Sequence, residues 1–268
     1  MKVKWIKRKE HAFFLGFIYS MVALVSASLI FPKSIGLMSV AFTSILLIPS
    51  LNVLLAQEEN QEVRQKKLSL KLLWRDHNDI LKVYIYMFLG VFAAFLLISL
   101  FYNQALVTQR FSSQLSAAGI HGSAIDFYGK FSQIVQNNLL IFIVCFMLSL
   151  VYGAGAVLFL TWNASVWGIV FGFFTRFTIN EGAGTNPIST FFSKITPFLP
   201  HMTTEALAYV IAAIMGGIMS KAIIREKWGS KKFNHILTDA LLVLGLGVAV
   251  VIVAAYLEVY VYAKILTG

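Results

Sequence analysis

The chain has 268 residues, of which 58% are hydrophobic and only 13% charged, with a mean hydropathy of +0.77. A soluble domain of this length cannot bury so much apolar surface, so the composition excludes a soluble protein and indicates an all-α, polytopic membrane protein. The net charge of +10 does not indicate nucleic-acid binding, because the basic residues flank apolar segments, where they meet acidic lipid headgroups. The single cysteine, Cys145, excludes internal disulfides and a cysteine-based metal cluster.

Apolar runs that cross about 30 Å of hydrocarbon need about 17 to 25 residues. Six runs of membrane-spanning length follow one another at 13–31, 34–56, 83–102, 139–160, 203–222 and 237–262. A seventh run at 163–175 is shorter and ends at Arg176, whose long side chain can extend to a membrane interface. Whether this run also spans decides the topology of everything that follows it.

The distribution of basic residues resolves the question of the short run. Lys and Arg cluster at 2–9, 64–82 and 221–232, and these segments hold 16 of the 22 basic residues. They lie on the same side of the membrane only if 163–175 spans. The positive-inside rule assigns that side to the cytoplasm. We therefore predict about seven transmembrane helices, with the N-terminus cytoplasmic and the C-terminus outside.

The chain divides into two expected parts at the end of its first long polar segment. Residues 1–82 are expected to form a transmembrane hairpin followed by a charged cytoplasmic helix, and residues 83–268 a five-helix membrane core. The charged helix is predicted within 57–82, where acidic residues precede basic ones. This order suits the helix dipole and allows charge pairs along the helix.

The polar segment 103–136 is expected to lie outside and to carry helical pieces of its own. Phe111, Leu115 and Ala118 recur at helical spacing within it. Apolar residues that share one helix face favour an amphipathic helix in the plane of the membrane interface. We expect these pieces to lie on the outer leaflet.

Small residues recur at helical spacing in the later spans. They are Gly153 and Gly155 in the fourth span, Gly168 and Gly172 in the fifth, and Ala208, Ala212 and Gly216 in the sixth. Stripes of small residues let transmembrane helices approach closely. We therefore interpret all of them as helix-packing positions.

Five polar residues at or within the spans are the candidates for a binding site or a polar network. They are Asn137 and Asn138 entering the fourth span, Asn163 entering the fifth, and His201 with Glu205 at the start of the sixth. A charge near the bilayer centre costs roughly 2.5 to 3.5 kcal/mol on insertion scales, so such groups face other helices or water. We expect His201 and Glu205, one helical turn apart, to pair and to meet Asn137 and Asn138. Asn163 lies near the other side and is expected not to reach them.

Asp239 and Glu258 stand near the two ends of the last span. Charged side chains in such places commonly extend to the interface. We expect both to be boundary groups that face lipid or headgroups.

The motifs of several enzyme classes are missing from the sequence. A His and a carboxylate four residues apart can reach one metal ion, but catalytic zinc generally has three protein ligands, and His-Glu-x-x-His does not occur. There is also no glycine-rich phosphate loop, no Ser-His-Asp order and no run of stacking aromatics on a basic surface. We predict no catalytic residue, metal or cofactor, and no nucleic-acid partner.

Polar residues and glycines of the later spans follow an order that is familiar from one protein family. The order is Asn137-Asn138, Gly153 with Gly155, Asn163 with Gly168, and Pro200-His201 with Glu205. It resembles the stage II sporulation protein M family, also described as a domain of unknown function. The resemblance covers about residues 80–262 and leaves the first two spans as an extra N-terminal hairpin. Family members commonly carry glycine where this chain has Met202 and Ala164.

The resemblance implies a multi-pass protein of the prokaryotic cytoplasmic membrane. The sporulation members look like polytopic scaffolds that hold peptidoglycan-degrading partners at the membrane, while most relatives occur in organisms that form no spores. It therefore favours a non-enzymatic scaffold or assembly subunit, with other membrane or envelope proteins, or a second copy, as partners. The residues leave one alternative open: a channel or transporter for a small solute or ion around His201 and Glu205, with the glycine-rich fifth span as a broken or mobile element.

Overall fold

The computed structural model describes residues 9–62, 70–117, 127–182 and 186–267, and within them the side chains of 10–53, 80–117, 131–182 and 186–260. The regular structure of these residues is α-helical throughout. The helices are α1 (Lys9–Ile30), α2 (Ile35–Glu62), α3 (Leu70–Phe101), α4 (Gln104–Arg110), α5 (Ser112–Ala117), α6 (Phe127–Tyr152), α7 (Val157–Asn180), α8 (Pro187–Ile195), α9 (Leu199–Arg225) and α10 (Lys231–Thr267).

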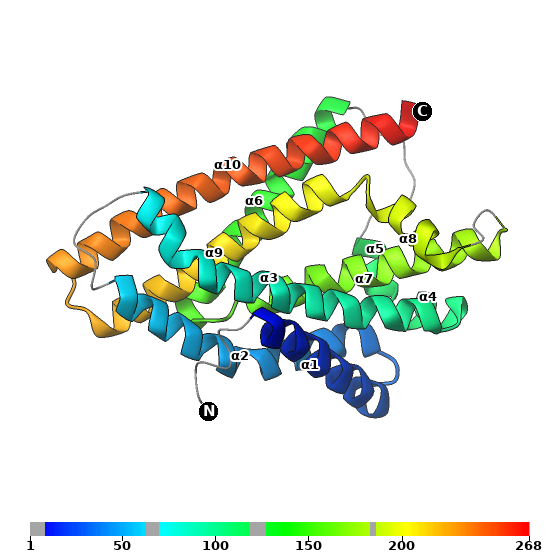
Figure 1. Cartoon of the computed structure of the whole chain (residues 1–268), viewed down its shortest axis with the longest axis horizontal. Helices are drawn as coiled ribbons and strands as arrows, with labels where there is room; N and C mark the ends of the chain where they lie inside the picture. Colours follow the sequence, from blue (N-terminus) through cyan, green and yellow to red (C-terminus); the bar gives the residue numbers. More distant parts are fainter. Residues whose placement is uncertain (1–8, 63–69, 118–126, 183–185, 268) are drawn as a thin grey trace.

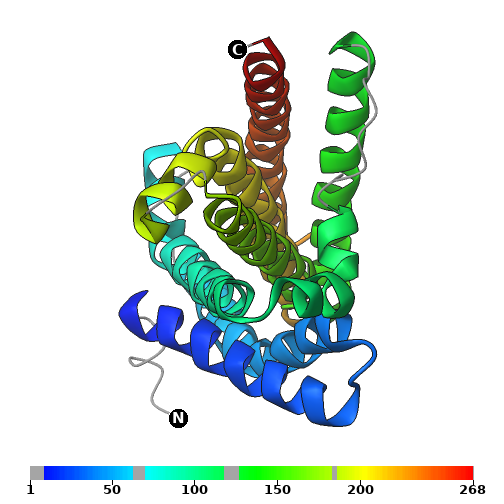
Figure 2. The same cartoon turned by 90° about the vertical axis from the view of Figure 1, so that its right-hand side faces the viewer.

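Seven of these helices, α1, α2, α3, α6, α7, α9 and α10, are long and apolar enough to cross a membrane, which confirms the predicted fold class. Helix α1 packs on α2 and α3, α3 packs on α7, and α9 packs on α6 and α10 (Figures 1 and 2). Helix α2 also reaches α7 and α9 and so joins the two halves of the bundle. The side that faces the cytoplasm stays a prediction from the charge distribution.

The expected fourth span, 139–160, is wrong in its boundaries, because the helix ends at Tyr152 and the next one begins at Val157. The intervening turn contains Gly153, which has a positive φ of 72° that favours glycine. Gly155 lies in the same turn, so these two glycines shape a connection and do not belong to a helix-packing stripe. The fifth span is correspondingly longer, a continuous helix of 24 residues, which contradicts the expectation of a short, broken element.

Two polar side chains stabilise this turn. Asn52 Oδ1 of α2 accepts a hydrogen bond from the N–H of Ala154 (3.1 Å), and Ser149 Oγ of α6 accepts one from the N–H of Ala156 (3.2 Å). Backbone amides released by a helix break are costly when they lack water, so they need such partners. The turn between α6 and α7 is therefore fixed by α2 as well as by its own helix.

The N-terminal hairpin is held to the core by direct backbone contact. Gly16 of α1 and Gly90 of α3 face the opposite backbone: a Cβ on Gly16 would collide with the carbonyl oxygen of Met87, and one on Gly90 with that of Phe13. This reciprocal contact requires glycine on both helices. The first helix is thus packed tightly against the rest of the bundle.

The central pair, α3 and α7, is packed in the same way through the glycines that the sequence singles out. A Cβ on Gly168 would lie 2.7 Å from the carbonyl oxygen of Phe92, and one on Gly172 would lie 2.5 Å from Cβ of Ser99. Ser99 also donates a hydrogen bond across the contact to the carbonyl oxygen of Ile169 (2.7 Å). Close approach and an interhelical hydrogen bond therefore act together.

Arg176 of α7 stabilises one end of the contact between α3 and α7. Its Nη1 donates to the carbonyl oxygens of Leu100 (2.8 Å) and Tyr102 (2.5 Å) at the C-terminal end of α3. These carbonyls have no partner within their helix, and a cation is favourable there because of the helix dipole. Arg176 thus ties the end of α7 to the end of α3.

The amphipathic pieces expected after the third span exist, but they pack on protein. Phe111 and Leu115 are buried, and α5 contacts α7 and α2. Gln114 Nε2 of α5 donates a hydrogen bond to the carbonyl oxygen of Gly36 (3.0 Å). The helical spacing was correct, whereas the apolar face contacts the bundle and not lipid; the position at the outer leaflet stays a prediction. Ala118 lies outside the described residues.

The charged helix expected within 57–82 is described only at its two ends. Helix α2 continues to Glu62 and α3 begins at Leu70, so both flanks are helical. Residues 63–69, which include Arg64, Lys66 and Lys67, lie outside the described residues.

The small residues of α9 form its contact with α6. Ala208, Ala212 and Gly216 are buried. A Cβ on Gly216 would collide with the carbonyl oxygen of Phe146 and would lie 2.8 Å from Cβ of Ser149. The stripe predicted in the sixth span is therefore a packing face.

We expect Gly216→Ala to destabilise the protein by about 1 to 3 kcal/mol, because the added methyl overfills a backbone contact. Gly245 of α10 is the matched control, since a Cβ there meets no heavy atom within 4 Å. Gly245→Ala should be neutral or stabilising by up to about 1 kcal/mol through helix propensity. Thermal unfolding in detergent measures both, and equal melting temperatures would show that α9 does not approach α6 as described.

Candidate functional site

Four side chains from three membrane-spanning helices form one group, which we call the polar cluster: Asn138 of α6, Glu205 and Tyr209 of α9, and Glu258 of α10. The Tyr209 hydroxyl lies 2.9 Å from Glu205 Oε1 and 3.2 Å from Asn138 Oδ1, in position to donate to either. Glu258 is close enough to interact electrostatically with Glu205 and with Asn138. Tyr209 follows Glu205 by four residues, so both point from the same face of α9.

The polar cluster lies within the membrane-spanning part of the bundle. Glu205 is six residues beyond Leu199, the first residue of its span, which corresponds to about 9 Å along the helix. Hydrocarbon supplies no hydrogen bonds, so the groups of the cluster depend on one another. Asn138 and Tyr209 are buried, whereas Glu205 and Glu258 are only partly buried.

The hydrogen bonds of the polar cluster are incomplete. A tyrosine hydroxyl carries one hydrogen and cannot donate to both of the acceptors it contacts, Glu205 and Asn138. In addition, Asn138 Nδ2 is buried and interacts with the carboxylate of Glu258, but without the geometry of a full hydrogen bond. A buried donor whose hydrogen bond is poorly formed is costly. The cluster therefore has unused capacity for hydrogen bonds at membrane depth.

His201 does not pair with Glu205, so that part of the sequence-based interpretation is wrong. The ring of His201 instead lies edge-on to Phe198, with the centroids 5.8 Å apart, and its buried Nδ1 has no partner in the structure. Phe198 in turn contacts Phe171 of α7. His201 thus faces an aromatic group beside α7, while Glu205 faces α6 and α10.

The asparagines are divided between two places. Asn137 is exposed at the edge of the polar cluster, and its Nδ2 reaches Asn138 Oδ1 at 3.5 Å. Asn163 Nδ2 donates to the carbonyl oxygen of Phe159 within α7 (2.9 Å). Asn137 and Asn138 therefore belong with Glu205, and Asn163 stays in a local contact of its own helix.

The two acidic residues of α10 both contact protein groups, contrary to the expectation that they are boundary groups facing lipid or headgroups. Glu258 belongs to the polar cluster, and Asp239 is buried, with its Oδ2 3.6 Å from His235 Nε2. One sequence signal for Glu258 was present, since it follows the small residues Ala254 and Ala255 by four and three residues, and both are buried in the structure. Tyr209 was missed too, although it stands one turn after Glu205.

The polar cluster offers two carboxylates, an amide and a phenol. In the part of the chain that the structure describes, no group of three or more His, Cys, Asp or Glu side chains could hold a metal ion. Groups of these kinds exchange hydrogen bonds and protons. The cluster can therefore accept a polar group from another molecule or a proton, within the membrane.

Comparison with known proteins identifies one family. The model of the family described as Stage II sporulation protein M matches residues 12–261. No curated protein and no solved structure matches the chain. The family match begins in α1, so it includes the two N-terminal spans that the resemblance at 80–262 left out.

We expect Tyr209→Phe to destabilise the protein by about 0.6 to 1.7 kcal/mol, the range measured for interhelical hydrogen bonds in membranes. Tyr84→Phe is the matched control, because both tyrosines are 1% exposed and the Tyr84 hydroxyl has no partner in the structure. Removing that hydroxyl should be neutral or stabilising. Thermal unfolding in detergent compares them, and an equal effect of both changes would argue against the hydrogen bonds of Tyr209.

Proposed function

The chain belongs to the stage II sporulation protein M family, and we propose that it is a non-enzymatic assembly subunit of the prokaryotic cytoplasmic membrane. In this proposal it holds other membrane or cell-envelope proteins through its transmembrane helices. The family resemblance supports the role, because sporulation members look like scaffolds for envelope proteins. The polar cluster indicates where a partner would bind.

The observation that carries the proposal is a polar cluster that is only partly covered at membrane depth. Glu205 and Glu258 are partly exposed, and Asn137 beside them is exposed. Polar groups that face lipid are costly, and a neighbouring helix with a polar side chain removes this cost by hydrogen bonding. A partner helix would also complete the hydrogen bonds of the buried Nδ2 of Asn138.

The surface around the cluster suits a transmembrane partner. Large apolar side chains are exposed along α6 and α10, including Leu140, Ile143 and Met147 on α6 and Leu246, Ile252, Val253 and Tyr256 on α10. Figure 2 shows that these two helices extend beyond the rest of the bundle. Exposed apolar residues are ordinary in a membrane, so they are compatible with a partner, and the polar cluster supplies the specificity.

Site-specific photo-crosslinking in native membranes tests the proposal. A benzophenone amino acid replaces Leu140 or Tyr256 beside the proposed contact, or Leu29 of α1 as a control, all of which are exposed. We expect a discrete protein adduct from the first two positions and only lipid adducts from Leu29. The adduct mass distinguishes a different protein from a second copy of this chain.

The substitution Glu258→Gln in the protein labelled at Leu140 tests whether formation of the crosslinked adduct depends on the polar cluster. The matched control is Glu181→Gln, at the exposed C-terminal end of α7. We expect the adduct to weaken with Glu258→Gln and to persist with Glu181→Gln. Adducts of equal yield from α1, α6 and α10, or their absence, would refute the assembly role of this surface.

A second candidate function, transport of a proton or small ion, is favoured by one observation. The hydroxyl of Tyr209 bridges a carboxylate and an amide inside the membrane, beside a second carboxylate, and intramembrane acidic residues often serve in proton relays. Measurement of proton flux into liposomes that contain the purified protein and an internal pH dye distinguishes transport from assembly. Proton flux that Glu205→Gln and Glu258→Gln both abolish would favour transport over assembly.

A further inference from the structure

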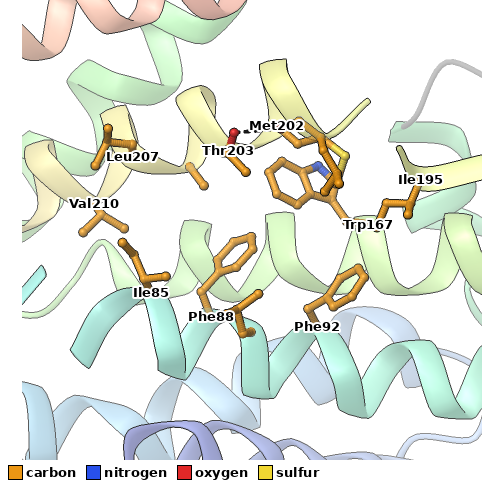
Figure 3. Close-up of a pocket in the computed structure, with 12 residues that line it drawn as sticks. Ile85, Phe88, Phe92, Trp167, Ile195, Met202, Thr203, Leu207 and Val210 are labelled. Carbon is orange, nitrogen blue, oxygen red and sulfur yellow. Dashed lines mark hydrogen bonds between the residues drawn. The ribbon is translucent and has the colours of Figure 1, made fainter. Parts of the chain in front are cut away.

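A groove runs between α3 and α9 (Figure 3). It uses a face of α9 that adjoins the face carrying Glu205 and Tyr209. It is lined by one face of each helix: Ile85, Phe88, Leu89 and Phe92 of α3, and Leu199, Met202, Thr203, Ala206, Leu207 and Val210 of α9. Within each helix these residues follow steps of three and four, the spacing of a complete helix-packing face. Two apolar faces thus oppose each other across an open space.

The groove has a buried floor and an open side. Phe88, Met202 and Val210 are buried, whereas Leu89 and Leu199 at its edges are 43% and 39% exposed. Trp167 of α7 contributes its indole ring to the lining (Figure 3). Because the lining residues belong mainly to membrane-spanning helices, the open side faces hydrocarbon.

The lining offers almost nothing to a polar ligand. Thr203 carries the only hydroxyl among the lining residues, and its one hydrogen can be donated to the carbonyl oxygen of Leu199 (2.7 Å) or of Pro200 (3.1 Å) in its own helix. The indole N–H of Trp167 is the only other side-chain donor among the lining residues. The chemistry of the groove therefore selects a hydrocarbon.

The size of the groove excludes a helix. Its volume is about 240 Å³. The eight residues from Ile85 to Phe92 span roughly 10 Å, so a cavity of that volume is on the order of 5 Å across, which is narrower than a helix about 10 to 12 Å wide. A single hydrocarbon chain is the occupant that fits.

We propose that the groove binds one acyl chain of an anionic phospholipid from the leaflet on the α8 side. Ile195, the last residue of α8, closes that end of the groove, and Lys194 immediately precedes it. Lys194 makes no ion pair with any described residue, so its charge is available for a phosphate at the membrane surface. This lipid site does not depend on the proposed function.

Quenching of Trp167 fluorescence by brominated lipid tests the proposal. The protein is reconstituted into phosphatidylcholine vesicles with increasing phosphatidylglycerol whose acyl chains carry bromine, and the Trp167 signal is the difference between wild type and Trp167→Phe. We expect quenching that saturates at a low fraction of brominated phosphatidylglycerol. Ala206→Phe, which fills the groove, should abolish the saturable part, whereas Gly245→Phe, at an open position of α10, should leave it unchanged.

Lys194→Gln tests the headgroup contact without altering the groove. It should remove the preference for brominated phosphatidylglycerol over brominated phosphatidylcholine while leaving quenching by either lipid at high fraction. Quenching that rises linearly with brominated lipid in wild type, and equally in Ala206→Phe, would overturn the proposal by showing ordinary boundary lipid. Absence of quenching would overturn the proposal as well. If a polyprenyl phosphate alone displaced the brominated lipid, the groove would belong to that lipid and the proposal would also be overturned.

Discussion

Direct backbone contact between helices is the constraint on which the rest of this bundle depends. Helices in hydrocarbon gain little from hiding apolar surface against one another, so van der Waals contact at small residues supplies much of their association. Gly90 fixes α3 against α1, Gly168 fixes it against α7, and Gly216 fixes α9 against α6. Because α3 and α9 each pack mainly on other helices, their facing apolar surfaces contact each other only in part. The groove between them follows from contacts made elsewhere.

Polar groups in the bundle divide into those with complete hydrogen bonds and those without. Thr175 donates to a carbonyl of its own helix, Asn52 caps the turn between α6 and α7, and Arg176 caps α3. Each of these side chains has a local structural role, because it forms hydrogen bonds with backbone groups close to it. The polar cluster differs, since its Tyr209 hydroxyl contacts two acceptors and the buried Nδ2 of Asn138 lacks a well-formed hydrogen bond. Its groups also meet across three helices at membrane depth, which sets the cluster apart from a single unpaired group such as the Tyr84 hydroxyl.

The sequence was sufficient for the seven spans, because length, hydropathy and the clusters of Lys and Arg act over whole segments. It was insufficient at the turn containing Gly153, where glycine and alanine are no more polar than the helices around them. Helical spacing placed His201 and Glu205 on neighbouring positions but could not say which helix each would face. Glu258 was misjudged for the same reason: only the packing of α10 on α9 brings it beside Glu205.

Helix α9 links these features through its different faces. Gly216 follows Glu205 by eleven residues, which is about three turns of helix, so the two lie on the same face. The backbone contact at Gly216 therefore sets the position of Glu205 and Tyr209 relative to Asn138 on α6. The groove uses an adjoining face of the same helix. A shift of α9 that widened the groove would also move the polar cluster, because one rigid helix carries both.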